Sequence, residues 1–527
     1  MHLTLSTLPA EIKAKIAANL GQIDALSLLK TGKAMEEAAL QRVYDKVVVD
    51  SCYTQFSKEY TPCYTYINSS YRLKRFFRAK RRRNVRGLYV LSLPDSTNVY
   101  DAETHDLMGD FFTDLHNLHE LVWQAENFTL DQLMRLPNRL LLERLALNIN
   151  FASQTTQTID KVTRGSLVFV NLHTLSLRPF ASSERLEGLL TALLGHNSTQ
   201  NHTLLRTLAL ARFDNDSPAL IPARELHLLG TVNPPTEESQ RLSRDIDIDT
   251  LSVLLSPKFA HRIAQLSELC LSSVLVNEKE AVNLAKCVEL SQLKTLVLKN
   301  VAEYGNGAEN TYAVGFLGMV GTRLANLVHL HLDFRETDCD TIAGFLRGLP
   351  QLTSLDLVVR MNALKRRNVD EAQLYYEYGA AIAGQQKLNK LSMEVRQEHS
   401  FCEIVMSTPK AMLLGLETLH ELTSLRLSCV QVSANEQLTK VLGKLDKLVF
   451  FDTFGVNTGG VPNLGLGMVH PNIYDEWFKV QHFAESFSKK QDKISYVRIN
   501  ECVFECAAGS VHPRDTIDRW FDGKVRV

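Results

Sequence analysis

Residues 352–357 read Leu-Thr-Ser-Leu-Asp-Leu, and this spacing of leucines decides the fold. The pattern Leu-x-x-Leu-x-Leu recurs along most of the chain, at intervals of about 24 to 36 residues between most neighbours. Some copies carry other apolar residues at one or more of the three positions, and the copy that begins at Leu448 is weak, with only Leu448 and Phe451 in place. The other copies begin at Val85, Leu118, Leu142, Leu172, Leu205, Leu266, Leu293, Leu327, Leu388, Leu422, Leu448 and Ile494.

The spacing has a simple physical meaning. Apolar residues at every second position predict a short strand with one buried face. The segments between copies, such as 340–346, have apolar residues at helical intervals. One strand and one helix cannot bury their own apolar faces, so such units stack side by side with their strands parallel. The sequence therefore predicts an α/β protein built around a parallel sheet.

This pattern resembles the leucine-rich repeat of the irregular, ribonuclease-inhibitor-like type. The resemblance implies a horseshoe-shaped solenoid over residues 46–527, with an inner parallel sheet, outer helices and about 12 to 14 irregular repeats. One feature departs from the family. An Asn or Cys is expected three residues after the last leucine, and Asn150 and Cys502 fit this, whereas Phe180, Val274 and Arg335 do not. The polar ladder that regularises the turns in that family is therefore in question here.

Long insertions interrupt the repeats, and each begins soon after a predicted strand. Insertions that follow parallel strands emerge at one edge of the sheet, which in solenoids is often the binding side. The alternative is that exposed loops tolerate extra residues. The Gly-rich stretch 455–467 could hold a peptide. The insertions are 214–249, 301–312, 361–378, 397–409 and 453–474.

The first 45 residues have a different pattern, typical of three short helices. Apolar residues recur every four positions from Leu8 to Leu20, with Pro9 in the first turn and Gly21 at the end. Asp24 is a candidate N-cap for a second helix over 25–31. Gly32 would close that helix, and a third would run over 33–43.

These residues resemble the F-box, here over residues 1–45. Its arrangement ahead of a leucine-rich-repeat domain is that of the F-box/leucine-rich-repeat family, and the run 44–49 is similar to the F-box end of fungal relatives. The resemblance implies that the helices bind a Skp-type adaptor protein and, through it, a cullin–RING ligase. The alternative is that the same apolar face packs on the first repeats. The candidate adaptor-binding residues are Leu8, Pro9, Ile12, Ile16, Leu20 and Leu28.

The resemblance further implies a function without catalysis. The chain would be the substrate-recognition subunit of an SCF-type ubiquitin ligase, holding a protein substrate with its solenoid and making no bond itself. A second hypothesis keeps the adaptor but uses the pair as a sequestering or assembly module outside the ligase. A third, GTPase regulation, would need an arginine that reaches a phosphate, for which Arg178, Arg426 and Arg498 are available. The F-box-like start of the chain argues against the third.

The residues between strand leucines point to the face opposite the helices. Their charges are mixed in sign, so they predict neither a purely acidic nor a purely basic ligand. The alternative for any one of them is an ordinary solvated position. The substrate-binding candidates are Arg178, Lys299, His331, Asp333, Asp356, Arg426 and Arg498.

A local basic stretch stands out from a chain whose net charge is -1. Between Tyr71 and Arg86 there are nine Lys or Arg residues and no acid. One interpretation is a helix with Leu73, Phe76 and Phe77 buried and the cations in solvent. Two others are a nuclear-localisation signal and a site for acidic or phosphorylated partners, centred on Lys80, Arg81, Arg82 and Arg83. Nucleic acid is not expected, because no zinc module or aromatic platform accompanies the charge.

Composition excludes several other classes. No apolar run is long enough to span a membrane, and the start of the chain lacks the pattern of a signal peptide, which predicts a soluble intracellular protein of the nucleus or cytoplasm. The nine scattered cysteines do not form a disulfide framework. Only two cysteines, Cys502 and Cys506, are close together, so we expect no metal and no cofactor. The motifs of nucleotide-binding loops, zinc proteases and serine hydrolases are absent, so we expect no enzyme.

Overall fold

The computed structural model of the chain divides into two compact units. Unit 1 consists of Met1–Phe213 and Val253–Leu266, and unit 2 of Asp214–Ser252 and Ser267–Val527. The structure describes residues 7–51, 64–94, 102–125, 128–148, 169–178, 183–195, 204–211, 257–276, 278–303, 315–335, 342–349, 351–360, 370–398, 403–428, 436–454, 473–489, 491, 493–500, 502–507 and 510–513.

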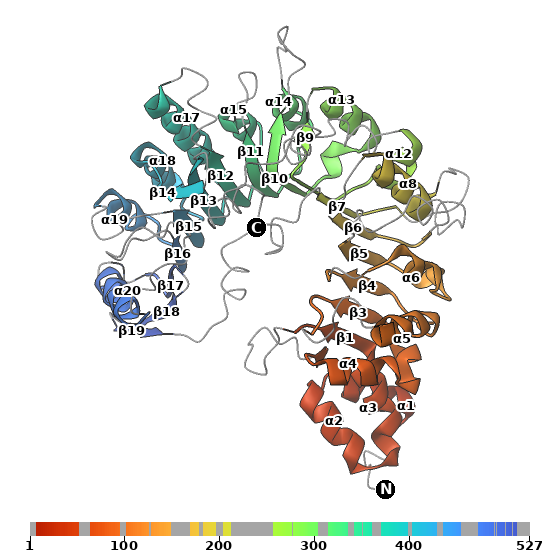
Figure 1. The fold of residues 1–527 in the computed structure, drawn as a ribbon. Helices are drawn as coiled ribbons and strands as arrows, with labels where there is room; N and C mark the ends of the chain where they lie inside the picture. The colour runs from red at the N-terminus through yellow and green to blue at the C-terminus, as the bar shows by residue number, and fades with distance from the viewer. Residues whose placement is uncertain are drawn as a thin grey trace, which may run out of the picture. The chain divides into compact units, whose positions relative to one another are not determined.

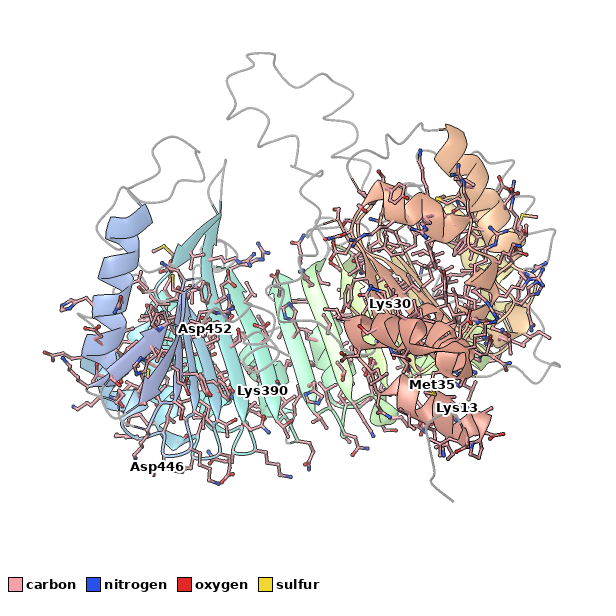
Figure 2. The ribbon with its side chains drawn as sticks, turned by 90° about the horizontal axis from the view of Figure 1, so that it is seen from below. Lys13, Lys30, Met35, Lys390, Asp446 and Asp452 are labelled. Carbon is pink, nitrogen blue, oxygen red and sulfur yellow. The ribbon has the colours of Figure 1, made fainter. Side chains whose placement is uncertain are left out.

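Unit 1 begins with three short helices. They are α1 (Ala10–Ala18), α2 (Gln22–Thr31) and α3 (Lys33–Asp45). Helix α3 contacts both others, and Figure 2 shows Met35 of α3 between the helices that carry Lys13 and Lys30. Gly32 separates α2 from α3 with φ +155°, a conformation that an L side chain rarely adopts. All three predicted helices are therefore present.

The strands of unit 1 form one parallel ladder. Its order is β2, β1, β3, β4, β5, β6, β7, and neighbouring strands pair in parallel. Helices cover one face of this ladder (Figure 1). The strands are β1 (Lys46–Val49), β2 (Thr65–Ile67), β3 (Gly87–Val90), β4 (Glu120–Trp123), β5 (Arg144–Asn148), β6 (Thr174–Arg178) and β7 (Thr207–Ala211). The helical segments are α4 (Ser70–Phe77), η2 (Lys80–Asn84), α5 (Ala102–Thr113), α6 (Leu130–Met134), η3 (Arg139–Leu141), α8 (Ser183–Leu194) and α12 (Pro257–Ile263).

Unit 2 repeats this arrangement with a longer ladder. Strands β8 (Glu268–Ser272), β10 (Thr295–Glu303), β11 (His329–Arg335), β12 (Ser354–Arg360), β13 (Lys390–Glu398), β15 (Ser424–Ser428), β16 (Phe450–Phe454) and β17 (Tyr496–Ile499) pair in parallel. Antiparallel strands β18 (Cys502–Ala507) and β19 (Ser510–Pro513) extend the ladder beyond β17.

Helical segments line one face of the unit 2 ladder as well (Figure 1). They are α13 (Glu278–Cys287), η6 (Leu290–Gln292), α14 (Phe316–Gly321), α15 (Ile342–Arg347), α17 (Glu371–Ala383), α18 (Lys410–Leu414), η8 (Gly415–Thr418), α19 (Glu436–Leu442) and α20 (Ile473–Ser488). Two short strands pair with the ends of longer ones: β9 (Leu275–Val276) with β10, and β14 (Glu403–Met406) with β13.

Every copy of the leucine pattern falls on a strand of one of the two ladders. In β12 the side chains of Leu355 and Leu357 are completely buried. Leu355 is in register with Leu330 on one side and Leu391 on the other, so the leucines form continuous rows across the strands. Burying one such side chain stabilises the fold by about 1.5–3 kcal/mol. The predicted α/β class with a mostly parallel sheet is confirmed.

The predicted insertions contain more regular structure than the sequence suggested. Helix α17 occupies the second half of 361–378 and buries Leu374, Tyr375 and Tyr378. Strand β14 occupies part of 397–409 and folds back antiparallel on β13. In 301–312, strand β10 continues to Glu303. Residues 214–249, 304–312, 361–369, 399–402 and 455–472 lie outside the described residues.

Asparagine side chains tie successive copies together just before the strands. Asn117 donates from its amide to the Arg83 carbonyl oxygen at 2.9 Å. Asn171 and Asn326 donate in the same way to carbonyls of the preceding copy, at 2.6 and 2.8 Å. Each of these residues stands directly before the first leucine of its copy. A polar ladder therefore exists, but at a different turn from the one that the resemblance implied.

A buried arginine holds the last helix of unit 1 in place. Arg262 of α12 is completely buried, and it donates to the carbonyl oxygens of Leu194 at 3.0 Å and Phe169 at 3.1 Å. Leu194 is the last residue of α8, where unpaired carbonyls and the helix dipole both favour a cation. Burial lowers the pKa of the Arg262 guanidinium to about 10.

We expect the Arg262→Ala substitution to lower the free energy of unfolding by about 3 kcal/mol or more, because it leaves buried carbonyls without donors and opens a cavity. Urea unfolding followed by circular dichroism measures this effect. The exposed Arg206 provides the control, since Arg206→Ala should cost less than about 0.5 kcal/mol. Equal effects of the two substitutions would contradict this assignment.

Candidate functional site

The three N-terminal helices pack through small residues and leave larger apolar side chains outside. Helix α1 buries only Ala17 and α2 only Ala25. Helix α3 buries the most, including Met35, and its buried Arg42 donates from Nε to the Leu20 carbonyl oxygen at 3.0 Å. Alanine contacts allow α1 and α2 to pack closely without burying their branched apolar residues.

All six predicted adaptor-binding residues remain accessible to some degree. Pro9 and Ile12 are exposed, with Ile12 at 40%. The other four are partly buried: Leu8, Ile16, Leu20 and Leu28. These side chains are therefore not consumed by packing within the described part of unit 1. Their contact with an adaptor stays a prediction.

Two further apolar residues on α2 were missed by the sequence analysis. Ile23 is 75% exposed and Leu26 is 41% exposed. The sequence placed Asp24 as the N-cap, whereas α2 begins at Gln22 with Gly21 as its N-cap, so both residues are helical and three positions apart. The sequence could have indicated both residues if the helix had been predicted to begin three residues earlier, because apolar residues three positions apart lie on one helix face.

A side-chain bridge fixes the start of α2. The amide of Gln22 donates to the Tyr66 carbonyl oxygen at 3.4 Å and accepts from the Tyr66 backbone N–H at 3.1 Å. Tyr66 lies in β2, which pairs with β1 at the edge of the ladder. Gln22 thus satisfies edge-strand backbone groups and anchors the helix that carries Ile23 and Leu26.

A second candidate site is a row of polar side chains on the strands of unit 2. The residues are in register across six strands, on the face opposite the buried leucines. Figure 2 shows Asp452 of this row among the strands of unit 2. In ladder order the row is His331, Asp356, Ser392, Arg426, Asp452 and Arg498.

Asp452 is the more deeply buried of the two carboxylates in this row. Its side chain is completely buried. It accepts from Arg498 at 3.0 Å (Nε) and 2.6 Å (Nη2), and it forms an ion pair with Arg426 Nε at 3.0 Å. The Arg426 guanidinium also stacks over the Phe454 ring, with 3.8 Å from the central carbon to the ring centroid. Two arginines therefore share a single buried carboxylate, and an aromatic ring packs on one of the two arginines.

Asp356 is the second carboxylate of the row and lies between His331 and Ser392. Its Oδ2 lies 2.9 Å from Nδ1 of His331. Burial raises the pKa of Asp356, but hydrogen bonds from His331 and Ser392 and the nearby charge of Arg426 outweigh burial, so the pKa lies below the ordinary value. The Nε2 atom of His331 has no hydrogen-bond partner among the described residues.

A parallel set of ion pairs lies beside this row. Arg360 donates from two nitrogens to both oxygens of Asp333, at 2.6 and 2.9 Å, and both side chains are buried. Glu394 lies 2.8 Å from Arg396 and 3.6 Å from Arg426. The described network thus pairs arginines with carboxylates throughout. Its charges largely cancel.

Five of the seven predicted substrate-binding residues meet in this network: His331, Asp333, Asp356, Arg426 and Arg498. Lys299 is partly buried on β10, in register with Ser272, and Arg178 ends β6 in unit 1. Sequence analysis did not include Asp452, Arg360 or Ser392. Asp452 lies in the weak copy that begins at Leu448, and Arg360 lies beyond the last leucine of its strand.

Unit 1 carries a smaller cluster on the corresponding face of its own strands. Glu120 accepts from Lys46 at 2.9 Å and from the Tyr89 hydroxyl, and Tyr64 stacks on Tyr89 with 5.3 Å between ring centroids. Burial raises the pKa of Glu120, but the bonds from Tyr89 and Lys46 outweigh burial and lower the pKa overall. Val48 packs in the same cluster. This face of unit 1 is more aromatic than the polar row of unit 2.

The predicted basic patch lies in η2. Lys80, Arg81 and Arg83 are exposed, whereas Arg82 is partly buried and pairs with Asp114. The preceding helix α4 buries Leu73, Phe76 and Phe77, as the first interpretation of this stretch predicted. Whether the patch serves localisation or an acidic partner stays open at this point.

No protein-family model matches the chain, and no curated protein matches it. Within the described ranges, no helix has the length and apolar character needed to cross a membrane. The same residues contain no group of three or more His, Cys, Asp or Glu side chains placed to hold a metal ion.

We expect Asp452→Asn to lower the free energy of unfolding by about 3–5 kcal/mol, because it leaves Arg426 and Arg498 buried without their shared counter-charge. Thermal and urea unfolding measure the loss. Asp446 is the matched control: it pairs with Lys493 at the surface, and Figure 2 shows it at the margin of unit 2. Asp446→Asn should leave stability near that of the wild type. A wild-type-like Asp452→Asn variant would refute the role of this network.

The lowered pKa of Asp356 predicts a pH dependence. A carboxyl whose pKa is lower in the folded state contributes stability above its unfolded value of about 3.9, and this contribution is lost as the pH falls through the folded value. The stability difference between wild type and Asp356→Asn should therefore shrink as the pH falls from about 5 to 3. Urea unfolding over this range measures the difference, and a constant difference would contradict the prediction.

Proposed function

We propose that the chain is the substrate-recognition subunit of an SCF-type ubiquitin ligase. Residues 1–45 would act as an F-box that binds a Skp-type adaptor, and residues 46–527 as a leucine-rich-repeat solenoid that binds a protein substrate. The chain would hold the substrate near the conjugating enzyme without catalysing the transfer.

One observation carries the proposal. Helices α1 and α2 expose Ile12, Ile23 and Leu26 at 40%, 75% and 41% while burying only alanines. Isolated apolar residues on a surface are ordinary, but several on two short adjoining helices are typical of a protein-binding face. The F-box-like sequence of the same helices supports an adaptor as the partner that covers this face.

The proposed solenoid is supported by the regular placement of the leucine pattern on parallel strands. Each copy supplies one strand, and helices line one face of each ladder (Figure 1). The shorter pattern intervals fall within the roughly 20 to 29 residues of leucine-rich repeats, and the longer ones exceed it, as the proposed irregular repeats require.

The second candidate function keeps the adaptor but lacks the cullin, making the pair a sequestering or assembly module. The exposed apolar face supports both functions equally. Affinity purification from native extract separates them, because recovery of adaptor with cullin supports the ligase subunit, whereas adaptor alone supports the module.

We expect the Ile12→Glu, Ile23→Glu double variant to weaken adaptor binding by at least about 100-fold. Each isoleucine, once buried, contributes about 1.5–3 kcal/mol, and 1.4 kcal/mol corresponds to tenfold in affinity. Isothermal titration calorimetry with a purified Skp-type adaptor measures the change. The wild-type chain should bind, and the double variant should keep the wild-type melting temperature because the two side chains are exposed.

Leu140→Glu is the matched control for this experiment. Leu140 is another large apolar residue of unit 1, and it is 56% exposed in η3, away from α1 and α2 in sequence. Its substitution should leave adaptor binding unchanged. Absence of binding by the wild-type chain, or equal binding by the double variant, would reject the adaptor-binding face.

A further inference from the structure

The basic stretch of unit 1 is held on a rigid apolar base. Phe76 and Phe77 of α4 lie 5.1 and 4.9 Å from Phe111 of α5, measured between ring centroids. With these rings buried, most cations of the stretch 72–86 are left toward solvent. The exposed ones are Arg72, Arg75, Arg78, Lys80, Arg81, Arg83 and Arg86. The positive surface is therefore fixed by the fold.

Within this surface lies a hollow of about 330 Å³. Its lining consists of Arg78, Ala79, Lys80, Arg82, Arg83 and Asp114. Four cations thus face one carboxylate, so the hollow keeps a clear positive charge. Two cations outside its lining, Arg81 and Arg86, are instead directed to Glu37 at 2.9 Å and Asp45 at 3.8 Å, both on α3.

Arg82 forms the fixed wall of the hollow. It donates from Nε to Asp114 at 2.6 Å and from Nη1 to the Phe77 carbonyl oxygen. Arg83 lies 3.7 Å from the other Asp114 oxygen, at the outer limit of an ion pair, and its side chain is 65% exposed. Asp114 is therefore occupied chiefly by Arg82, while Lys80 and Arg83 are available at the rim.

We propose that this hollow binds the phosphoryl group of a phosphorylated protein segment. A phosphoryl group carries a charge of about −1.5 to −2 and three acceptor oxygens, which suits several converging Arg and Lys donors. Tyr71 is 73% exposed on α4, four positions before Arg75 and seven before Arg78, so it lies on the same helix face and can contact residues beside the phosphate. The site is independent of the proposed adaptor-binding face.

The geometry favours a protein segment over nucleic acid or a membrane. Nucleic-acid binding usually rests on many phosphate contacts along a backbone, whereas here one hollow accommodates one phosphate. An anionic membrane would contact the exposed cations of the whole surface, Arg72 and Arg75 included, whereas a single phosphoryl group engages the cations that line the hollow. Substitution of Lys80 and Arg83, which line the hollow, therefore tests whether the ligand binds in the hollow.

Fluorescence anisotropy with the full-length chain tests the proposal. The probes are two fluorescein-labelled nonapeptide libraries with randomised flanks, one with a fixed central phosphoserine and the other with serine. We expect the phosphoserine library to bind at least about tenfold more tightly. The Lys80→Ser, Arg83→Ser variant should lose this preference, whereas Lys80→Arg, Arg83→Lys should retain most of it.

The matched control removes the same number of charges from the same surface outside the hollow. Arg72→Ser, Arg75→Ser should change binding of the phosphoserine library by less than about twofold. Melting temperatures establish that all variants are folded. Equal losses in both pairs, or equal binding of the two libraries, would overturn the proposal. Tighter binding of a labelled 20-residue uridine RNA or of phosphatidylserine vesicles would overturn it in favour of those ligands.

Discussion

Burial of strand leucines between the ladders and the helices is the constraint on which the rest of the structure depends. Side chains alternate across a strand, so placing Leu355 and Leu357 against the helices commits Asp356 to the opposite face. Parallel register then brings residues at the same position of neighbouring copies within about 5 Å of one another. Each charge between two leucines consequently has a charge or hydroxyl of the next copy beside it.

This constraint explains why the charged residues of unit 2 pair with each other. A carboxylate such as Asp452, buried by its neighbours, is tolerated only with compensating donors, and Arg426 and Arg498 stand in register to supply them. Buried ion pairs add little net stability, but breaking one is costly. The row therefore penalises any shift of one strand against the next. A slip of β15 by one residue along β16 would set Arg426 beside Phe451 or Thr453, in place of Asp452.

The sequence predicted the elements that have a periodic apolar pattern, and it missed those that depend on contacts between segments distant in the chain. The strands that carry a leucine copy come from the leucine spacing, and α1 comes from apolar residues every four positions, whereas the short strands β9 and β14 have no such signal. The start of α2 was wrong because Asp24, a good N-cap, lies inside a helix that Gly21 caps and Gln22 anchors to β2. The antiparallel hairpin β18–β19 follows the last leucine copy, where no repeat signal remains. Asp452 was missed because its copy lacks the last leucine.

The strand face of unit 2 and the helical segments of unit 1 differ in the side chains that are accessible to a partner. On the strand face of unit 2, charges are largely neutralised by neighbours in register, so recognition by charge there would have to break existing pairs. The N-terminal helices are not arranged in register, so their side chains are not paired with neighbours in this systematic way. Ile23 is therefore left unburied on α2, and Lys80 and Arg83 are left at the rim of a hollow whose single carboxylate is bound to Arg82. Apolar and electrostatic recognition by unit 1 should accordingly be sought on α1, α2, α4 and η2.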